Sequence, residues 1–323
     1  MIRGLLILTS LIVTALATAA GDKICFSFQQ LDTSVICILD LNTGRRRIIT
    51  NPFPKCDASP SWSPDGGKIV FSRYGPQPPT FNYSDLYLIN SDGTGLRRLI
   101  PNPEFEFEGR KYRFQFQKSP DWSPIGGEIA FAGSGKGFQD IFIVSEDGGS
   151  LRPLLKNFKT LPPMVNNPSW SPDGRRIAFD ITLDRDGSRS SDICIVDVLT
   201  GNVQLLTQTP DVWEHHPSWS PDGRRIAYLR SEVDFGSVTT DIVVMDLASG
   251  RGERVPLPKW LELAWYRICW DRSGRRIIFS GFKGGRTDLY LYDLSSGKLW
   301  YGEATAIKPL GLIYTLWALI KSR

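Results

Sequence analysis

The sequence has few histidines and cysteines and a small net charge. Its 323 residues include two histidines and five cysteines, and no two cysteines have the C-x-x-C spacing of a zinc or redox site. The formal net charge is +4, from 38 basic and 34 acidic residues, so the basic surface of a nucleic-acid-binding protein is not expected. Signatures of a nucleophile elbow, a zinc-protease helix, a P-loop and a dinucleotide fold are also absent. We therefore expect no nucleic-acid partner, no cofactor and no bound metal.

The N-terminus carries a short apolar run. Met1-Ile-Arg3 is followed by apolar residues from Leu5 to Leu16 and by small residues from Ala17 to Ala20. This order is typical of a cleavable signal peptide, which we predict over residues 1–20. A membrane anchor is the alternative, but the run is shorter than the ~20 residues that a spanning helix requires. We expect the mature chain to be periplasmic or secreted and to have no membrane span.

A tryptophan-centred phrase recurs through the chain. Its full form is Pro-Ser-Trp-Ser-Pro-Asp-Gly, and its tryptophans are Trp62, Trp122, Trp170, Trp219 and Trp270. They follow one another at roughly 50 residues, a period typical of propeller and solenoid repeats. Proline fixes φ and glycine accepts the left-handed conformation, so Ser-Pro-Asp-Gly predicts a tight turn between two strands. Each unit continues with a strand that ends in an aromatic residue and a strand that opens on an acidic one.

These units predict an all-β chain, a six-bladed β-propeller of four-stranded antiparallel blades. Five units begin at the tryptophans, and residues 22–50 supply three strands of a sixth. We predict that residues 312–319 complete this blade by pairing with the N-terminal strands, because closure removes exposed sheet edges. A packed helix or a membrane contact are the alternatives for this apolar tail. The predicted domain covers residues 21–320, with blades near 22–50 plus 312–319, 59–100, 119–156, 167–207, 216–256 and 268–302.

The repeat resembles that of the TolB-like β-propeller family, over residues 22 to about 318. Two phrases depart from the pattern: Ile125 replaces the turn aspartate of one repeat, and the last repeat reads Asp271-Arg-Ser-Gly. The resemblance implies a propeller and leaves the function open, because one fold hosts many functions. We expect a monomeric, non-catalytic scaffold that binds a protein or a cell-envelope component. A small-ligand or carbohydrate sensor and a metal-dependent channel enzyme that acts on a lactone or glycan are the alternatives.

The resemblance places ligand sites near the mouth of the central channel. Polar residues enter the predicted inner strands there, and this mixed set suits a polar or peptide-like ligand. The candidate binding residues are Asp57, Lys118, Asn167, Glu214, His215, His216 and Arg267. A metal ion at the two histidines would need further ligands from other blades, such as Asp57 or Cys269. We favour hydrogen-bonding roles for these side chains over metal binding.

An insertion before Trp122 alternates aromatic and polar residues on both sides of Glu108-Gly109-Arg110-Lys111. This period of two predicts an extra hairpin with one aromatic face. The face would be formed by Phe105, Phe107, Tyr112, Phe114 and Phe116. It either offers an apolar surface to a protein partner or folds down over its own blade.

The cysteines leave two alternatives. Cys25 and Cys37 lie in neighbouring predicted strands and could form a disulfide in an oxidising compartment. Buried free thiols are the other interpretation, because cysteine is among the most frequently buried residues.

Overall fold

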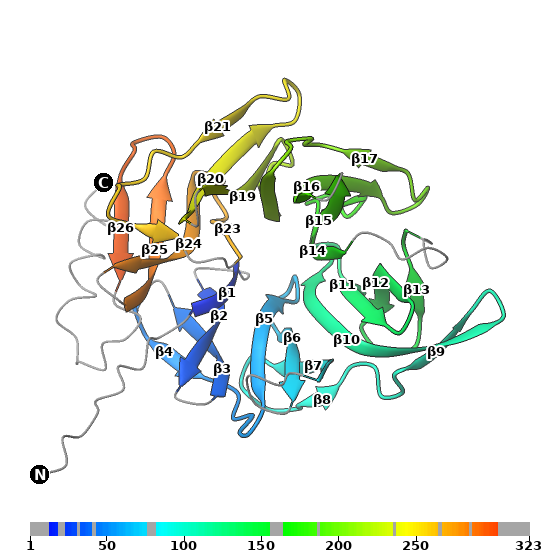
Figure 1. Cartoon of the computed structure of the whole chain (residues 1–323). Helices are drawn as coiled ribbons and strands as arrows, with labels where there is room; N and C mark the ends of the chain where they lie inside the picture. Colours follow the sequence, from blue (N-terminus) through cyan, green and yellow to red (C-terminus); the bar gives the residue numbers. More distant parts are fainter. Residues whose placement is uncertain are drawn as a thin grey trace, which may run out of the picture.

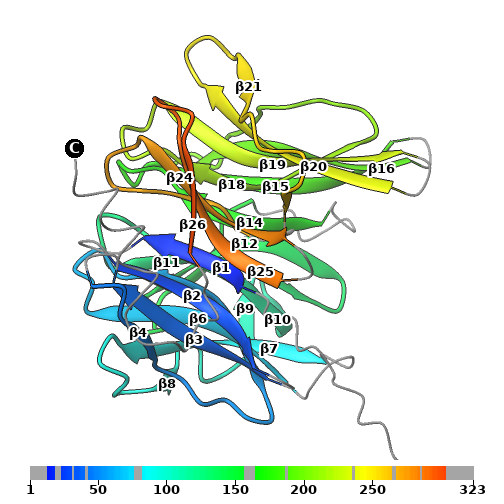
Figure 2. The same cartoon turned by 90° about the vertical axis from the view of Figure 1, so that its left-hand side faces the viewer.

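The computed structural model describes residues 13–18, 23–30, 33–40, 43–75, 82–155, 164–185, 188–234, 237–263, 267–283 and 286–302. Every regular element in these ranges is a strand, so the all-β prediction is confirmed. Within the same ranges, no helix has the length and apolar character needed to cross a bilayer. The strands form antiparallel sheets around a common centre (Figure 1), and Figure 2 shows the same arrangement from the side.

Two sheets cover the N-terminal half. The first has the order β1-β2-β3-β4, with β1 (Val13–Thr18), β2 (Lys23–Gln30), β3 (Thr33–Asp40) and β4 (Arg46–Ile48). The second contains β5 (Cys56–Trp62), β6 (Lys68–Gly75), β7 (Tyr83–Asn90), β8 (Arg97–Arg98), β9 (Glu104–Phe107), β10 (Arg110–Trp122), β11 (Glu128–Gly135), β12 (Phe138–Ser145) and β13 (Leu151–Pro153). It consists of two meanders that a single parallel pair, Phe116 with Ser84, connects.

Two further sheets cover the C-terminal half. One contains β14 (Val165–Trp170), β15 (Arg176–Arg185), β16 (Ser188–Asp197), β17 (Val203–Leu205), β18 (Val212–Trp219), β19 (Arg225–Asp234), β20 (Ser237–Asp246) and β21 (Gly252–Arg254). Its two meanders meet at the parallel pair Ser191 with Trp213. The other contains β22 (Glu262–Leu263), β23 (Cys269–Trp270), β24 (Arg276–Lys283), β25 (Arg286–Asp293) and β26 (Leu299–Gly302).

The free edge of β2 differs from the prediction. We expected residues 312–319 to pair there, but β1 takes this edge, with Leu16 opposite Phe26 and Thr18 opposite Ile24. Strand β1 lies inside the predicted signal peptide. The apolar run that suits a signal peptide also suits an inner strand, because both need a short apolar segment. Residues 303–323 lie outside the described residues, so the closing strand stays a prediction.

A β-bulge recurs in the inner strands β5, β10, β14 and β18. In each of them the pairing register shifts just before the tryptophan, between the residue four positions before it and the residue directly before it. In β5 these residues are Ala58 and Ser61. The residue three positions before the tryptophan has a positive φ of 51° to 56°, and these residues are Ser59, Ser119, Asn167 and His216. Non-glycine residues rarely adopt this conformation, so its repetition marks a constrained position in these four inner strands.

The Ser-Pro-Asp-Gly turns adopt the expected geometry. In the first, the Ser63 hydroxyl and the Gly67 N–H donate to Asp65 Oδ1 at 2.5 and 2.9 Å, and Gly66 has a φ of 71°. The basic residue that opens the following strand reaches the next tryptophan. Arg176 stacks over Trp219 at 4.8 Å and Arg225 over Trp270 at 4.7 Å from guanidinium carbon to ring centroid. These cation–π contacts join successive meanders.

The core lies between neighbouring sheets, as the cysteines illustrate. Cys25 packs in a cluster with Ile36 and Trp62, whereas Cys37 packs in another cluster with Phe26. Cys25 pairs with Ile38, and Cys37 pairs with Phe26. The two thiols therefore lie on opposite faces of one sheet, because successive side chains alternate across a strand. All five cysteines are buried. Cys25 and Cys37 are not joined to each other, so the disulfide alternative is wrong.

Candidate functional site

Arg267 connects three inner strands at the centre of the ring. It lies just before β23, and its Nη1 and Nη2 groups donate to the backbone carbonyls of Pro120 at 3.1 Å and Pro168 at 2.8 Å. Its Nη2 atom is also 3.5 Å from Asp121 Oδ1. These partners belong to β10 and β14, which lie across the centre from β23 in Figure 1. Only 7% of Arg267 is exposed, so its charge is held among these inner strands and away from solvent.

Asp121 is the carboxylate partner of this arginine. It accepts hydrogen bonds from the Ser61 hydroxyl at 3.2 Å and from the Trp170 N–H at 2.8 Å. Burial raises the pKa of Asp121, and the Arg267 charge and the Trp170 N–H oppose that rise. Asp121 and Arg267 together connect β5, β10, β14 and the segment before β23.

Asp180 of β15 forms the second centre of the network. Its Oδ1 atom accepts hydrogen bonds from Asn167 Nδ2 at 2.8 Å and from the His216 N–H at 3.1 Å. Asn167 in turn accepts a hydrogen bond from the Ser119 hydroxyl at 3.0 Å. Burial raises the pKa of Asp180 to about 6. The bulge residues of three inner strands are therefore held together by one buried carboxyl group.

A hydrogen bond joins the two histidine rings at this site. His215 Nδ1 and His216 Nδ1 are 2.7 Å apart, so one nitrogen donates and the other accepts. His215 Nε2 lies 3.2 Å from the Ser231 hydroxyl. Burial lowers the pKa of His215 to about 4, and burial, His215 and Arg267 hold the pKa of His216 well below its ordinary value. Both rings are therefore neutral at pH 7.

Three other predicted residues have separate surroundings. Asp57 is buried and forms a two-point ion pair with Arg73, at 2.6 and 2.9 Å. Lys118 is half-buried over the Phe116 ring at 4.3 Å, and burial lowers its pKa. Glu214 accepts a hydrogen bond from the Thr209 hydroxyl at 3.3 Å. Burial raises the pKa of Glu214.

The predicted set therefore divides. Asn167, His215, His216 and Arg267 gather around Asp121 and Asp180, a group that we call the channel network. Asp57, Lys118 and Glu214 have other partners, and Asp57 and Glu214 lie five residues before their tryptophans. Two carboxylates of the network, Asp121 and Asp180, were not predicted. Their signal is a departure from the repeat: Asp121 stands where other phrases have Ser61 or Ser169, and Asp180 follows the aromatic where another repeat has Ser72.

The predicted hairpin is present, but its aromatic face is not an exposed surface. β9 pairs with the start of β10 around the two-residue turn Glu108-Gly109, whose residues have φ values of 48° and 73°, as a type I′ turn requires. Phe105 stacks on Phe114 at 4.6 Å and meets Phe142 edge-on at 5.3 Å between ring centroids. Of the residues predicted to contact a partner, Phe114 is buried. The other four are half-buried: Phe105, Phe107, Tyr112 and Phe116. The hairpin thus folds over its own meander, the second of the two alternatives.

Exposed apolar side chains occur at both ends of the strands, and six of them lie at the end from which the chain enters the inner strands. In an antiparallel meander, the loop before the first strand and the loop between the second and third strands lie at the same end. We call this end the loop face. Its exposed apolar residues, with their exposed fractions, are Phe53 66%, Tyr83 38%, Met164 48%, Val233 55%, Val238 46% and Trp260 49%.

The channel network has the composition of a binding site. Its charged groups already hold internal partners. The half-buried Ser119, Asn167 and His216 also hydrogen-bond within the network, but each has further donor or acceptor capacity. In the described ranges, no group of three or more histidine, cysteine, aspartate or glutamate residues is placed to hold a metal ion. The arrangement can orient a polar ligand by hydrogen bonds.

The Asp180 carboxyl gives a pH-dependent prediction. Its folded-state pKa of about 6 exceeds the value of about 4 for an unfolded aspartate, so the folded protein holds this proton to a higher pH. The resulting stabilisation is fully present below about pH 4 and is lost as the pH rises through about 6. Asp180→Asn should remove this loss and raise the free energy of unfolding at pH 7 by about 2 kcal/mol. Urea unfolding of both proteins at pH 4.5 and 7.5 measures it, and an identical pH dependence would contradict it.

Comparison with known proteins supports the propeller architecture. Residues 111–255 match the family described as TolB beta propeller domain, which confirms the resemblance seen in the repeat. TolB from Acinetobacter baumannii has a similar fold, with a TM-score of 0.65 and 19% identity. The similarity covers 88% of this chain and 65% of that protein, so the chain spans less than two thirds of its length.

Two structures of other proteins share the fold. The β-propeller domain of the trilobed protease from Pyrococcus furiosus has a TM-score of 0.54 and 14% identity, over 91% of this chain and 83% of that one. An oligogalacturonate lyase from Vibrio parahaemolyticus has a TM-score of 0.57 and 15% identity, over 85% of this chain and 76% of that one. At these identities the similarity establishes the fold and leaves the activity open.

Proposed function

Because this chain carries the TolB-like β-propeller repeat, we propose that it is an exported, non-catalytic propeller that binds a protein or a component of the cell envelope. The mature protein begins near residue 21 and acts as a monomer in the periplasm or outside the cell. Its six blades surround one channel, and residues 312–319 take the edge of β2 once the leader strand β1 has been removed.

The exposed apolar residues of the loop face carry this proposal. Phe53 and Trp260 are 66% and 49% exposed, and they lie in loops that precede two different inner strands. A contiguous exposed apolar patch marks a surface for another macromolecule, and in this proposal the loop-face residues form such a patch. Aromatic residues are enriched at such interfaces because they bury a large area when a partner docks.

The channel network supports binding over catalysis. Arg267 is engaged by two carbonyls and by Asp121, and Asp180 is engaged by Asn167 and the His216 N–H. A general base or nucleophile has to reach the reacting group of a substrate, whereas these groups hold the channel wall together. The remaining polar groups favour a small polar or carbohydrate ligand at the channel as the second candidate function.

A double substitution on the loop face tests the scaffold. Phe53→Ser with Trp260→Ser should weaken capture of the envelope partner by about tenfold or more, because aromatic residues dominate interface energies. Leu199→Ser is the matched control: Leu199 is 94% exposed in the turn between β16 and β17, at the opposite end of the strands.

Capture from envelope extracts, followed by titration of the recovered partner, gives the measurement. Equal affinity of the double variant and wild type would exclude the loop face as the docking surface. An equal loss in both variants would point to a nonspecific effect of removing surface apolar area.

A further inference from the structure

An arginine–tryptophan contact recurs at two of the interfaces between successive meanders, and at another interface a lysine has the position of the arginine. In two repeats the residue six positions after the tryptophan is an arginine that lies over the tryptophan of the next repeat, whereas Glu128 has this position after Trp122. Arg176 takes this position over Trp219, and Arg225 takes it over Trp270. At both interfaces a planar guanidinium covers the face of an indole ring.

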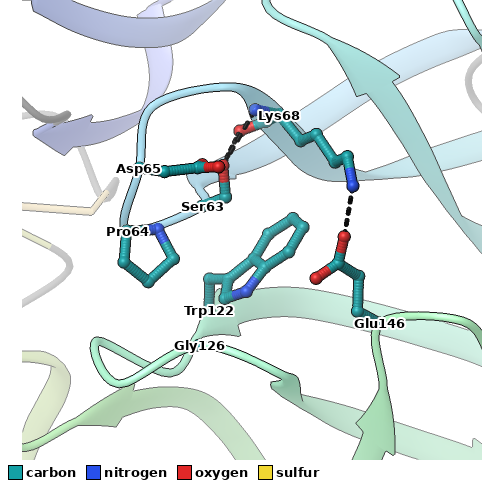
Figure 3. Close-up of a pocket in the computed structure, with 7 residues that line it drawn as sticks. All are labelled: Ser63, Pro64, Asp65, Lys68, Trp122, Gly126 and Glu146. Atoms are coloured by element: carbon teal, nitrogen blue, oxygen red, sulfur yellow. Dashed lines mark hydrogen bonds and ion pairs between the residues drawn. The ribbon is translucent and has the colours of Figure 1, made fainter.

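Lys68 occupies the same position opposite Trp122. Its ammonium group forms an ion pair with Glu146, which lies in the turn after β12. Figure 3 shows the lysine side chain extended past the indole toward this carboxylate. The place that a guanidinium fills at the other two interfaces is therefore not filled by a guanidinium here.

A cavity of about 190 Å³ lies at this place. It is lined by Ser63, Pro64, Asp65, Lys68, Trp122, Gly126 and Glu146, and Figure 3 shows these side chains around it. The cavity is smaller than the ~300 Å³ lower bound of typical ligand pockets, so it suits a single side chain or a fragment of that size.

The charges around the cavity favour a cation. The lining carries two carboxylates, Asp65 and Glu146, and one ammonium, that of Lys68, so its net charge is −1, and the ammonium is paired with Glu146. Asp65 uses its Oδ1 atom for the turn, with Ser63 and Gly67 as donors. Hydrogen bonds from these groups lower the pKa of Asp65, so it is ionised at neutral pH.

We infer that this cavity is a binding site for a guanidinium group, supplied by an arginine side chain of a partner or by a small guanidino compound. The ligand would stack on Trp122 as Arg176 stacks on Trp219, with Asp65 and Glu146 as its counter-charges. A guanidinium fits this place better than an ammonium, because it is planar and weakly hydrated and offers paired donors to carboxylates.

Lys68→Arg is the decisive variant, since the new guanidinium would occupy the site from within. We expect binding of the peptide acetyl-Gly-Arg-Gly-amide to weaken at least tenfold, and the Tm to rise by about 1–3 °C through the added stack. Lys111→Arg, at an exposed position of the β9–β10 hairpin, is the matched control and should change neither quantity. Calorimetric titration and thermal unfolding measure both effects.

Two further ligands and one further variant make the test specific. The same peptide with citrulline in place of arginine is a neutral analogue of the same shape and should bind at least tenfold more weakly. Asp65→Asn should bind the arginine peptide several-fold more weakly than wild type does. Acetyl-arginine amide that binds as tightly as the peptide would identify a small guanidino compound as the ligand, and tighter peptide binding would identify a protein segment.

Three results would overturn the inference: undetectable peptide binding to wild type, equal binding to Lys68→Arg, or equal binding of the citrulline peptide. The site lies at the Ser-Pro-Asp-Gly turns, at the opposite end of the strands from Phe53 and Trp260. Its test is therefore independent of the loop-face proposal, and either one can fail alone.

Discussion

Arg267→Met should lower the free energy of unfolding by about 3–5 kcal/mol, the cost of removing one partner from a buried ion pair. The substitution leaves the Asp121 carboxylate without its cation and two buried carbonyls, of Pro120 and Pro168, without a donor. Because Arg267 joins a late strand to two strands of the middle of the chain, the loss should appear as a lower urea midpoint for the whole protein.

A surface arginine gives the control. Arg254 pairs with Glu232 at 2.9 Å and with Asp241 at 3.1 Å, and its side chain is 57% exposed. Arg254→Met should cost at most about 1 kcal/mol, because solvent screens exposed ion pairs. Adding Asp121→Asn to Arg267→Met should recover part of the loss by removing the unpaired charge. If Arg267→Met lowered the free energy of unfolding by less than about 1 kcal/mol, the role of Arg267 in holding the channel network together would be contradicted.

The contrast between the repeat and the channel explains what the sequence could predict. Turns, strands and tryptophan positions depend on local residue chemistry, so the recurring phrase predicted them. The contact of Arg267 with Pro120 depends on how far the meanders curve around the centre, which no local pattern encodes. The candidate site was therefore located by position along the inner strands, while its hydrogen-bond partners were not.

Departures from the repeat were the most informative residues for the site. Asp121, Asp180 and Lys68 each replace a residue type that recurs at the same position elsewhere, and each changes the local contacts. A comparison with the consensus of the repeat alone would interpret such positions as weakened turns or strands. The structure shows that Asp180 supplies a buried carboxylate and Asp121 a half-buried one, and that Lys68 leaves an indole uncovered by a guanidinium.

The β9–β10 hairpin had two alternatives that the sequence could not separate. The alternating pattern establishes one aromatic face, but the same face suits a partner or the underlying sheet. Gly133 of β11 favours packing of the hairpin on the sheet, because a Cβ atom at this position would lie 2.6 Å from the rings of both Phe114 and Phe142. The backbone of β11 thus leaves room for the rings above it.

Phe114→Ala should therefore act as a core substitution and lower the free energy of unfolding by about 3–5 kcal/mol. The Phe114 ring lies 4.6 Å from Phe105, 4.8 Å from Phe142 and 5.6 Å from Phe131, between centroids. Its removal opens a cavity under the hairpin, because neighbouring rings pack too rigidly to fill the space. Urea unfolding measures the stability, and amide exchange of Phe105 and Phe107 measures the docking of β9.

Phe53→Ala is the control for removing an aromatic ring, since Phe53 is 66% exposed and surface changes stay within about 0.5 kcal/mol. The two variants should also separate in binding. Phe53→Ala should weaken binding of the loop-face partner and leave the free energy of unfolding unchanged. Phe114→Ala should lower the free energy of unfolding and leave partner binding unchanged under conditions where the protein remains folded. If Phe114→Ala instead weakened partner binding at unchanged stability, the hairpin would be a docking surface, and its packing against Phe142 would contribute little to the fold.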